Sequence, residues 1–515
     1  MPRALFSVWN KTGIVELGQS LTLVGWDIVA TGRTAEILTG AGVSVTPVEQ
    51  LTGLPEMLGG RVKTLHPAIH APILARDHSK DMSELTAHGY APIELVVCNL
   101  YPFQQTIAQA SVTIAQAVEQ IDIGGVTLIR AAAKNFERVI VVVNPADYEA
   151  VQVALVEDGQ VSASERRNLA LKAFAHTRDY DTAIHSYLMG DNLLDESANT
   201  LGDHFTIGLT QTQSLRYGEN PHQQAGLYAT HADLGPLGGT LLQGKPLSYN
   251  NLLDASAAYQ AVSAFGTDDK AAVVIIKHMN PTGIAVADTI AEAMPEALAS
   301  DPVSAFGGII AVNRQVDAEF VRALGGLFVE VLIAPTFTDE ACELLMQGRK
   351  NCRLIAVNET QVQKTLEFRS IQGGVLVQEL DIGDPDTTEW QVVTRRSPTP
   401  EEVDALKFAW KAAQYVRSNA VVLAGQTATF GIGGGLPSRV DAAKLAVEKA
   451  GERAQGAVLA SDAFFPFADG LQIAIDVGVT AVIQPGGSIR DQEVIDASDE
   501  ADLAMIFTKV RHFRH

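Results

Sequence analysis

The chain has 515 residues, of which 47% are hydrophobic and 19% charged, and its formal net charge is −22. This length predicts three to four compact units, and the acidic balance excludes a general DNA- or RNA-binding protein, which needs a basic face. No apolar run reaches the ~18 residues of a membrane span, no secretory signal is visible, and the three cysteines lack CxxC spacing. We therefore expect a cytoplasmic protein without a zinc site or disulfide framework, in which any anionic ligand is bound by a local cluster of Lys and Arg.

The first 145 residues alternate short apolar runs with segments of helical periodicity. Such alternation predicts a parallel, doubly wound α/β sheet. Ser162 and Glu165 form a capping box that begins a helix, and the polar stretch 189–204 after it predicts a domain boundary near residue 195. The predicted strands of this half lie in 4–9, 27–32, 94–103 and 138–143.

The second half continues the α/β style with more strands. Thr399 and Glu402 form a capping box around Pro400, which predicts a helix to about Arg417. We expect one domain over 196–515, built from two substructures split near 385–400, although no repeat is visible in the residues. Its predicted strands lie in 270–278, 306–312, 330–335, 373–378, 420–425, 456–465, 479–487 and 503–508.

Two stretches of the first half have the layout of a phosphate site. Residues 7–13 and 30–38 each lead from a strand through a Gly- and Thr-containing turn into a helix, with Lys11 and Arg33 nearby. The amides at the start of such a helix bind anions. Either stretch alone is weak evidence, because these turns are common, but two in one sheet strengthen the prediction.

Two further regions combine charge with irregular structure. Residues 59–70 crowd two cations and two imidazoles among prolines and aliphatics; a solvated loop is the alternative, but the mixture favours a site. Residues 98–103 end the most apolar strand of this half, where doubly wound sheets bind ligands. Asp122 opens the next helix, and its more frequent role is a simple N-cap.

The stretches 61–70, 98–103 and 122–135 closely resemble, in this order, part of a bifunctional purine-biosynthesis family. This family is phosphoribosylaminoimidazolecarboxamide formyltransferase/inosine monophosphate (IMP) cyclohydrolase, and its N-terminal domain is similar in fold to methylglyoxal synthase. The resemblance implies that residues 1–195 are an IMP cyclohydrolase domain, which closes a formamido-imidazole carboxamide ribonucleotide into a ring with loss of water.

The resemblance implies four catalytic residues in this domain. A carboxamide nitrogen attacks a formyl carbon, and the developing oxyanion needs a cation, for which Lys63 is the candidate. Tyr101 and Asp122 would shuttle protons, and Lys134 would add positive charge. The residues expected to hold the nucleotide and its 5′-phosphate are Ser7, Lys11, Thr34, Arg61 and Thr64.

The most conspicuous stretch of the second half is 270–283, an apolar strand that ends in Lys277 and His278 before Asn-Pro-Thr-Gly. Such a pair is more often a surface feature than a catalytic one. An all-apolar strand followed by a turn, however, would place both side chains at the mouth of a sheet, where burial lowers the pKa of each. Formyl transfer to an aromatic amine needs a base and a donor of this kind.

The second half resembles the same family almost end to end. The matching stretches are 215–223, 247–258, 275–283, 300–314, 333–337, 416–424, 459–467, 484–491 and 507–515. The resemblance implies that His278 is the catalytic base, Lys277 its cationic partner, and that Asn419 orients the reacting groups. The substrate-binding residues that it implies are Arg216, Tyr217, Asp301, Asp462, Phe464, Phe465, Pro466, Arg511, Phe513 and His515.

The resemblance also implies a co-substrate, a fold and a partner. The co-substrate is 10-formyltetrahydrofolate and no metal is required. The region 196–515 would be a formyltransferase domain of two subdomains similar in fold to cytidine deaminases, without zinc, in a homodimer whose transferase sites lie at the subunit interface. The C-terminal residues 511–515 would enter the site, although a disordered basic tail is the default for such a sequence.

Five positions depart from the family pattern. In the first half these are Trp9 and Asn10, in place of small or acidic residues, and Arg33, in place of a glycine; in the second half they are Gly434 for alanine and Leu436 for glutamine. Contacts made through the backbone would survive these changes, whereas side-chain contacts would not. The departures leave one alternative open, a nucleotide-binding regulatory homologue that has lost one activity.

Overall fold

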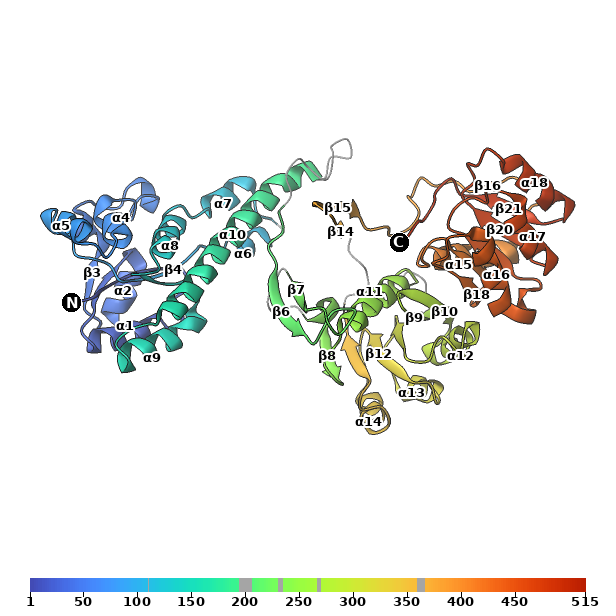
Figure 1. Cartoon of the computed structure of the whole chain (residues 1–515), viewed down its shortest axis with the longest axis horizontal. Helices are drawn as coiled ribbons and strands as arrows, with labels where there is room; N and C mark the ends of the chain where they lie inside the picture. Colours follow the sequence, from blue (N-terminus) through green and yellow to red (C-terminus); the bar gives the residue numbers. More distant parts are fainter. Residues whose placement is uncertain (110, 194–205, 230–234, 266–269, 359–365) are drawn as a thin grey trace. The chain divides into compact units, whose positions relative to one another are not determined.

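The structure is a computed structural model that describes residues 1–109, 111–193, 206–229, 235–265, 270–358 and 366–515. The chain divides into two compact units, Met1–Gly208 and Leu209–His515 (Figure 1). The boundary predicted at residue 195 lies outside the described residues. In the part of the chain described, no helix is both long and apolar enough to cross a membrane.

The first unit contains the predicted parallel sheet, with strand order β3-β2-β1-β4-β5. Every residue of β4 is buried, which explains why this strand reads as a continuous apolar run. All four predicted strands are present, and the short edge strand β3 was not predicted. The strands are β1 (Arg3–Val8), β2 (Asp27–Ala30), β3 (Val45–Pro47), β4 (Leu95–Asn99) and β5 (Ile140–Val142).

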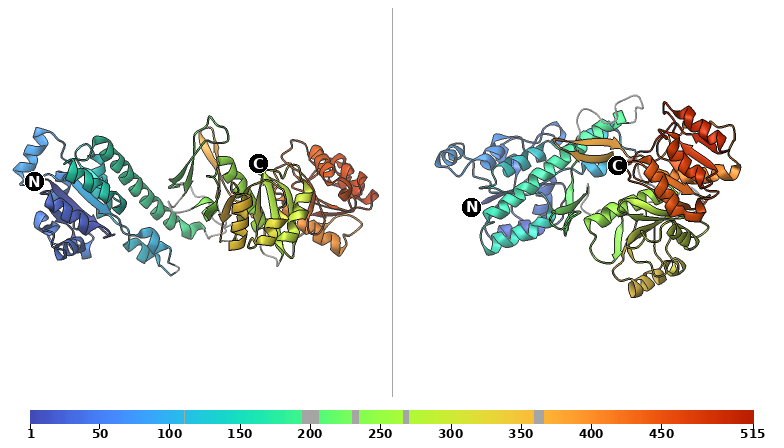
Figure 2. Two further views of the ribbon diagram at one scale, coloured as in Figure 1. Left: turned by 90° about the horizontal axis from the view of Figure 1, so that it is seen from below. Right: turned by 45° about the vertical axis from the view of Figure 1, so that its right-hand side comes forward.

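Helices cover both faces of this sheet. One buried cluster contains residues of α4, α8 and α10, and another contains residues of α1, α2 and α9. The long helix α10 begins at the predicted capping box and runs along the unit (Figure 2). The helices are α1 (Ile14–Leu23), α2 (Gly32–Gly40), α3 (Val48–Thr52), α4 (Pro67–Leu74), α5 (Ser79–Ala87), α6 (Phe103–Ile107), α7 (Ile114–Glu119), α8 (Gly124–Lys134), α9 (Tyr148–Glu157) and α10 (Ala163–Leu193).

The second unit contains two six-stranded sheets with the same topology. Their strand orders are β10-β9-β11-β12-β13-β8 and β18-β17-β19-β20-β21-β16. Neighbouring pairs run antiparallel, antiparallel, parallel, parallel and antiparallel in both sheets. The chain order of strands and helices is also the same, so the unit is an internal structural repeat that the residues themselves do not reveal.

The first repeat comprises β8 (Thr240–Gln243), α11 (Tyr249–Ser263), β9 (Ala271–Lys277), β10 (Asn280–Ala287), α12 (Ile290–Ser300), β11 (Gly308–Val312), α13 (Ala318–Ala323), β12 (Val329–Ala334), α14 (Asp339–Gly348) and β13 (Arg353–Ala356). The second comprises β16 (Gln391–Val392), α15 (Pro400–Ala413), β17 (Val421–Ala424), β18 (Thr429–Gly433), α16 (Arg439–Ala450), β19 (Val458–Ser461), α17 (Ala468–Asp476), β20 (Ala481–Gln484), α18 (Asp491–Glu500) and β21 (Ala504–Phe507).

Two hairpins lie outside these sheets. They are β6 (Thr210–Leu215) with β7 (Ala225–Ala229), and β14 (Leu366–Ile371) with β15 (Gly374–Glu379). The strand predicted over 373–378 belongs to the second hairpin, most of whose residues are exposed. The other predicted strands of this half lie in the two main sheets.

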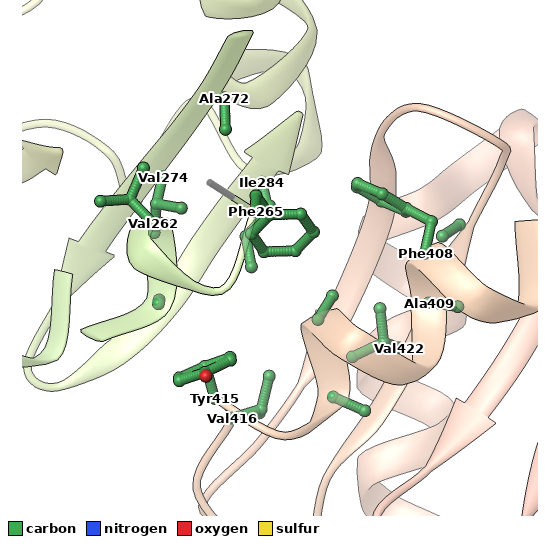
Figure 3. Packing of buried hydrophobic residues seen from close by; sticks show 14 of the residues in the cluster. Val262, Phe265, Ala272, Val274, Ile284, Phe408, Ala409, Tyr415, Val416 and Val422 are labelled. Carbon is green, nitrogen blue, oxygen red and sulfur yellow. The ribbon is translucent and has the colours of Figure 1, made fainter. Parts of the chain in front are cut away.

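One hydrophobic core joins the two repeats. It contains residues of α11 and β9 from the first and of α15 and β17 from the second. The Phe265 and Phe408 rings, whose centroids are 5.6 Å apart, lie on opposite sides of this junction (Figure 3). The helix α15 starts at the predicted Thr399 capping box, and its packing here fixes the segment that follows it.

Candidate active sites

The loop after β1 in the first unit is tied to the end of β4. The side-chain oxygen of Asn99 accepts hydrogen bonds from the backbone N–H groups of Trp9 at 2.7 Å and Asn10 at 2.8 Å. The Lys11 ammonium donates to the Val8 carbonyl oxygen. Trp9 and Asn10 therefore make these contacts with Asn99 through their backbone N–H groups, and their side chains are not needed for the contacts.

Three cations meet at the carboxyl edge of this sheet. Burial lowers the pKa of Lys11, and the positive charges of Arg33 and Lys63 lower it further. Lys63 Nζ lies 3.7 Å from a Glu56 carboxylate oxygen. Such a cluster in a chain of net charge −22 could bind an anion, and Arg33, a departure from the family pattern, belongs to the cluster.

Asp122 lies beside Lys63 and Tyr101. Its carboxylate accepts the Gly125 N–H at 2.7 Å, so it does cap α8. Burial raises the pKa of Asp122, and this is partly opposed by hydrogen bonds from Gly125 and the Tyr101 backbone and by the charge of Lys63. Asp122 therefore caps the helix, and its role as a proton carrier stays a prediction. The Tyr180 hydroxyl, which sequence reasoning missed, accepts the Asp122 N–H at 2.8 Å.

The nucleotide-binding candidates of this unit divide into two groups. Thr34 is buried, and its hydroxyl donates to the Val8 carbonyl at 3.2 Å, while the Ser7 hydroxyl accepts a hydrogen bond from Thr31 at 3.1 Å. Thr64 is buried, with its oxygen 2.9 Å from where a Cβ on Gly124 would lie. These three residues line the same edge of the sheet.

Arg61 and Lys134 are both exposed. The exposed Arg61 guanidinium pairs with Glu119. Lys134 is exposed at the last turn of α8, and a helix rises about 1.5 Å per residue, so it lies roughly 16 Å along the axis from the end that Asp122 caps. Within this unit, the structure does not bring Lys134 to the other candidates.

In the second unit, Lys277 and His278 lie at a hairpin tip. The turn between β9 and β10 is His278–Met279, with φ of 53° and 63°. The Asp254 carboxylate of α11 accepts both of their backbone N–H groups, at 3.0 and 2.7 Å. The prediction that Asn-Pro-Thr-Gly forms the turn is wrong, because these residues begin β10, an edge strand where Pro281 is tolerated.

The expected burial of this pair is not found. His278 is exposed and Lys277 is half-buried, because a two-residue turn projects beyond the sheet. The Lys277 ammonium donates to the Phe306 carbonyl oxygen, which fixes its direction. The prediction that both side chains are buried is therefore wrong, and their roles in catalysis stay a prediction.

Asp301 is occupied by contacts within the chain. Its carboxylate accepts the Ser304 N–H at 3.0 Å and pairs with Lys449. Burial raises the pKa of Asp301, but the hydrogen bonds from Lys449 and Ser304 outweigh it and hold the pKa below its usual value. Asp301 thus stabilises the loop that carries Phe306, the acceptor for Lys277.

The Asn419 side chain is held on all sides. Its Nδ2 donates to the carbonyl oxygens of Leu436 at 2.9 Å and Pro437 at 3.1 Å, and its Oδ1 accepts from Arg439 at 2.7 Å. Leu436 therefore contributes through its backbone, so the family's glutamine is not needed for this contact. These contacts fix the direction of the Asn419 side chain, and its role in orienting the reacting groups stays a prediction.

The Asn419 loop is joined directly to the hairpin tip. The Arg417 N–H donates to the Asn280 side-chain oxygen at 3.0 Å, and the Arg417 guanidinium lies 3.0 Å from Met279 Sδ. A Cβ on Gly434 would lie 2.2 Å from Val416 Cγ1, so the glycine at this departure makes room for the loop. The structure thus brings the His278 turn and the Asn419 loop to one place.

Two of the folate-binding predictions are wrong. Asp462 is 0% exposed, and its carboxylate accepts from Arg439 at 2.5 Å and from the Ser418 hydroxyl at 2.5 Å. Phe465 is also 0% exposed. Neither side chain can reach a ligand, because one completes a buried ion pair and the other belongs to the core.

The same corner has exposed residues. Phe464 and Pro466 are exposed as the prediction requires. Phe467, at 45% exposure, and the carboxylate residue Asp469 lie beside them at the start of α17. Sequence reasoning missed these two; the alternation of buried and exposed positions after a strand end was the available signal.

The C-terminal residues are ordered, and they alternate. Arg511, Phe513 and His515 are exposed, while His512 and Arg514 point inward. The Arg514 backbone N–H donates to the Ser418 hydroxyl at 3.1 Å and its carbonyl accepts the Ser418 N–H at 2.8 Å. The default of a disordered tail is therefore wrong, and the residues that anchor it were missed.

Arg216 and Tyr217 lie side by side after β6. The guanidinium donates to the Tyr217 hydroxyl at 2.8 Å and lies 4.6 Å from the centre of its ring. The Asn250 side chain of α11 donates to the Glu219 carbonyl at 3.3 Å, which ties this turn to the first repeat. Among the residues that the structure describes, no three His, Cys, Asp or Glu side chains are grouped as a metal site would need.

Comparison with known proteins identifies the family. A model described as "AICARFT/IMPCHase bienzyme" matches residues 132–449, and one described as "MGS-like domain" matches residues 13–127. The chain belongs to the AICARFT/IMPCHase bienzyme family. The family predicted from the motifs and its methylglyoxal synthase-like N-terminal domain are thereby confirmed.

Members of the AICARFT/IMPCHase bienzyme family match this chain from end to end. The "Bifunctional purine biosynthesis protein PurH" of Chloroflexus aurantiacus is 51% identical over 100% of this chain and 98% of that protein. Proteins of the same name from Desulfitobacterium hafniense and Anoxybacillus flavithermus are 49% and 48% identical, over 100% of this chain and 99% of each relative. A solved structure titled "Crystal structure of ForH" is 35% identical, covers 36% of this chain and 97% of that chain, and has a TM-score of 0.35.

Proposed function

We propose that this chain catalyses two consecutive steps of purine nucleotide synthesis, one in each unit. The second unit transfers a formyl group from 10-formyltetrahydrofolate to the amine of 5-aminoimidazole-4-carboxamide ribonucleotide. The first unit closes the formamido product to IMP. The observation that carries this proposal is the 51% identity over the whole chain to a bifunctional purine biosynthesis protein.

Formyl transfer requires one new C–N bond and the loss of another. The substrate amine attacks the formyl carbon, the bond from that carbon to the folate nitrogen breaks, the amine loses a proton and the folate nitrogen gains one. His278 would accept the proton, and the Lys277 ammonium would stabilise charge on the formyl oxygen. Lys277 and His278 lie on one hairpin tip fixed by hydrogen bonds, and this tip lies next to the loop whose Asn419 side chain is also fixed by hydrogen bonds. This arrangement supports these roles.

Ring closure requires no second substrate. The carboxamide nitrogen bonds to the formyl carbon, each of the two nitrogens gives up one proton, and the formyl oxygen leaves as water. Lys63 would stabilise the oxyanion, and Asp122, whose pKa burial raises, would carry protons together with Tyr101. Lys11, Arg33 and the adjacent hydroxyls would bind the 5′-phosphate.

The finer parts of the proposal concern the folate and a second subunit. Phe464, Pro466, Phe467 and Asp469 would form the folate wall, since they are the exposed residues of their corner. We place the transferase site at a homodimer interface, because His278 and the outward residues of the tail are exposed in one chain. The two repeats would be deaminase-like subdomains that work without zinc.

The experiment uses the two steps as controls for each other. Purified full-length protein is given the aminoimidazole ribonucleotide with 10-formyltetrahydrofolate, or the formamido ribonucleotide alone. His278→Ala should abolish transfer and leave cyclisation, whereas Lys63→Ala should do the reverse. Nucleotide binding without either turnover would instead favour a regulatory homologue, and sedimentation at micromolar concentration tests the dimer.

A further inference from the structure

A buried histidine in the C-terminal tail is held between two carboxylates. His512 is 2% exposed. Its Nδ1 lies 2.7 Å from Asp381 Oδ2, and its Nε2 lies 2.8 Å from Asp384 Oδ1. Two carboxylate oxygens facing the two ring nitrogens favour a proton on each nitrogen, which makes the side chain an imidazolium.

The rest of this cluster is neutral or fixes the carboxylates. The indole N–H groups of Trp390 and Trp410 donate to Asp384 at 3.2 and 3.0 Å. The Trp410 ring is 5.2 Å from the His512 ring, and the Gln414 amide lies 3.2 Å from its Nε2. Arg514 also acts on Asp381, and Asp386, Asp404, Lys407 and Lys411 line the same cavity as Asp381 and Asp384. In the hydrogen bonds described for the two carboxylates, the imidazole ring is the group that bridges them.

The contacts of His512 with Asp381 and Asp384, here called the clamp, help to fix the path of the C-terminal tail. The His512 backbone N–H donates to the Asp462 carbonyl at 3.0 Å. Two residues later, the Arg514 guanidinium donates to Gln260 Oε1 at 3.0 Å. Since side chains of an extended segment alternate, inward anchoring of these two residues turns Arg511, Phe513 and His515 outward.

We propose that His512 is a positioning residue for formyl transfer: clamped between Asp381 and Asp384, it fixes the tail so that its alternate residues are presented together to the substrate. The inference rests on the proposed function, because it assumes that the tail enters the transferase site. His512 itself touches no substrate. Its part is to hold a short, otherwise irregular segment in one register.

Loss of the His512 proton should release the clamp. Burial lowers the pKa of His512, but its hydrogen bonds to the Asp381 and Asp384 carboxylates outweigh this effect and raise the pKa to about 9. The pKa of His512 in the folded protein lies above the ordinary histidine value of 6.5. The contacts of His512 with the two carboxylates are therefore complete below pH 6.5 and are lost as the pH rises through about 9. Formyl transfer should fall in this window, and cyclisation in the first unit provides the internal reference.

The test compares both activities of the full-length protein across this pH range. His512→Gln removes the charge and should lower kcat/KM for formyl transfer roughly 10- to 100-fold, mainly through KM for the nucleotide, with cyclisation unchanged. His512→Lys keeps a cation and should recover part of the activity and flatten the alkaline fall. Asp384→Asn should move the fall to lower pH, which a merely structural role would not do. Glu343→Gln, at an exposed position of α14, is the control and should not move it.

The outcomes separate this inference from the proposed function. Wild-type protein without formyl transfer refutes the function. An active wild type whose rate and pH profile are shared by His512→Gln overturns the inference. If circular dichroism shows that His512→Gln is unfolded, the position of the alkaline fall in Asp384→Asn decides, and an unchanged position overturns the inference as well.

Discussion

The hairpin tip that carries His278 should depend on one distant carboxylate. Replacing Asp254 by alanine removes the acceptor for the N–H groups of His278 at 3.0 Å and Met279 at 2.7 Å. A hydrogen bond to a charged group contributes about 1.5–3 kcal/mol, and each left-handed non-glycine residue costs about 1–2 kcal/mol. The hydrogen bonds to Asp254 and the strain of the two left-handed residues are of similar size. Without Asp254, nothing in the turn offsets the strain of the His278–Met279 backbone. A loss of about 3 kcal/mol in placing the base corresponds to roughly a 100-fold fall in kcat/KM.

The assay measures both steps on the same purified protein. Asp254→Ala should lower formyl transfer by about that factor, while cyclisation, which we place in the other unit, should stay at the parent rate. Asp254→Asn keeps an acceptor oxygen without the charge and should fall between the two. Full transfer activity in Asp254→Ala, with the variant folded, would show that the turn does not need this carboxylate and that the reasoning is wrong.

Three further changes probe other parts of the chain. Arg33→Gly removes an exposed cation from the Lys11 cluster. This should raise KM for the formamido ribonucleotide by a few-fold, which corresponds to about 1 kcal/mol at most. Steady-state cyclisation kinetics measure KM, and an unchanged value would show that the phosphate binds elsewhere. Gly434→Ala puts a Cβ 2.2 Å from Val416 Cγ1, which should destabilise the second unit by about 1–3 kcal/mol in thermal unfolding, and Val416→Ala should restore it. Because the pKa of His512 is raised from 6.5 to about 9, the stability of this unit should fall by about 3 kcal/mol as the pH rises through that interval; denaturant titrations should show no such excess in His512→Gln.

The sequence predicts those features that depend on neighbours along the chain. The strands of the first sheet are apolar on both faces, so their runs are visible without the structure. Ser162 and Thr399 begin helices through contacts only three residues away. The candidate residues of the first site follow strand ends, and the carboxyl ends of parallel strands meet at one edge.

The errors come from contacts over longer distances. Asn-Pro-Thr-Gly is read as a turn because Pro and Gly usually interrupt strands, yet the turn that forms depends on Asp254, 24 residues before His278. Asp462 is read as a ligand because a carboxylate at a strand end is often free, but here Arg439, 23 residues earlier in the chain, occupies it. The last five residues alternate between exposed and inward positions, but this alternation, which separates His512 from its neighbours, is not visible in the residue types.

The repeat explains why one hairpin tip can be catalytic while its counterpart is structural. The turn between β17 and β18 occupies the same place in the second repeat as the His278 turn in the first. Its residue Thr427 accepts the Val286 N–H at 2.7 Å, and Ala428 forms an isolated bridge with Ala285. The second tip therefore pairs with β10, the edge strand of the first sheet, and its exposed backbone groups are used to join the two repeats. The first tip has no such strand beside it among the described residues, and it projects toward solvent, where a basic pair can meet a substrate.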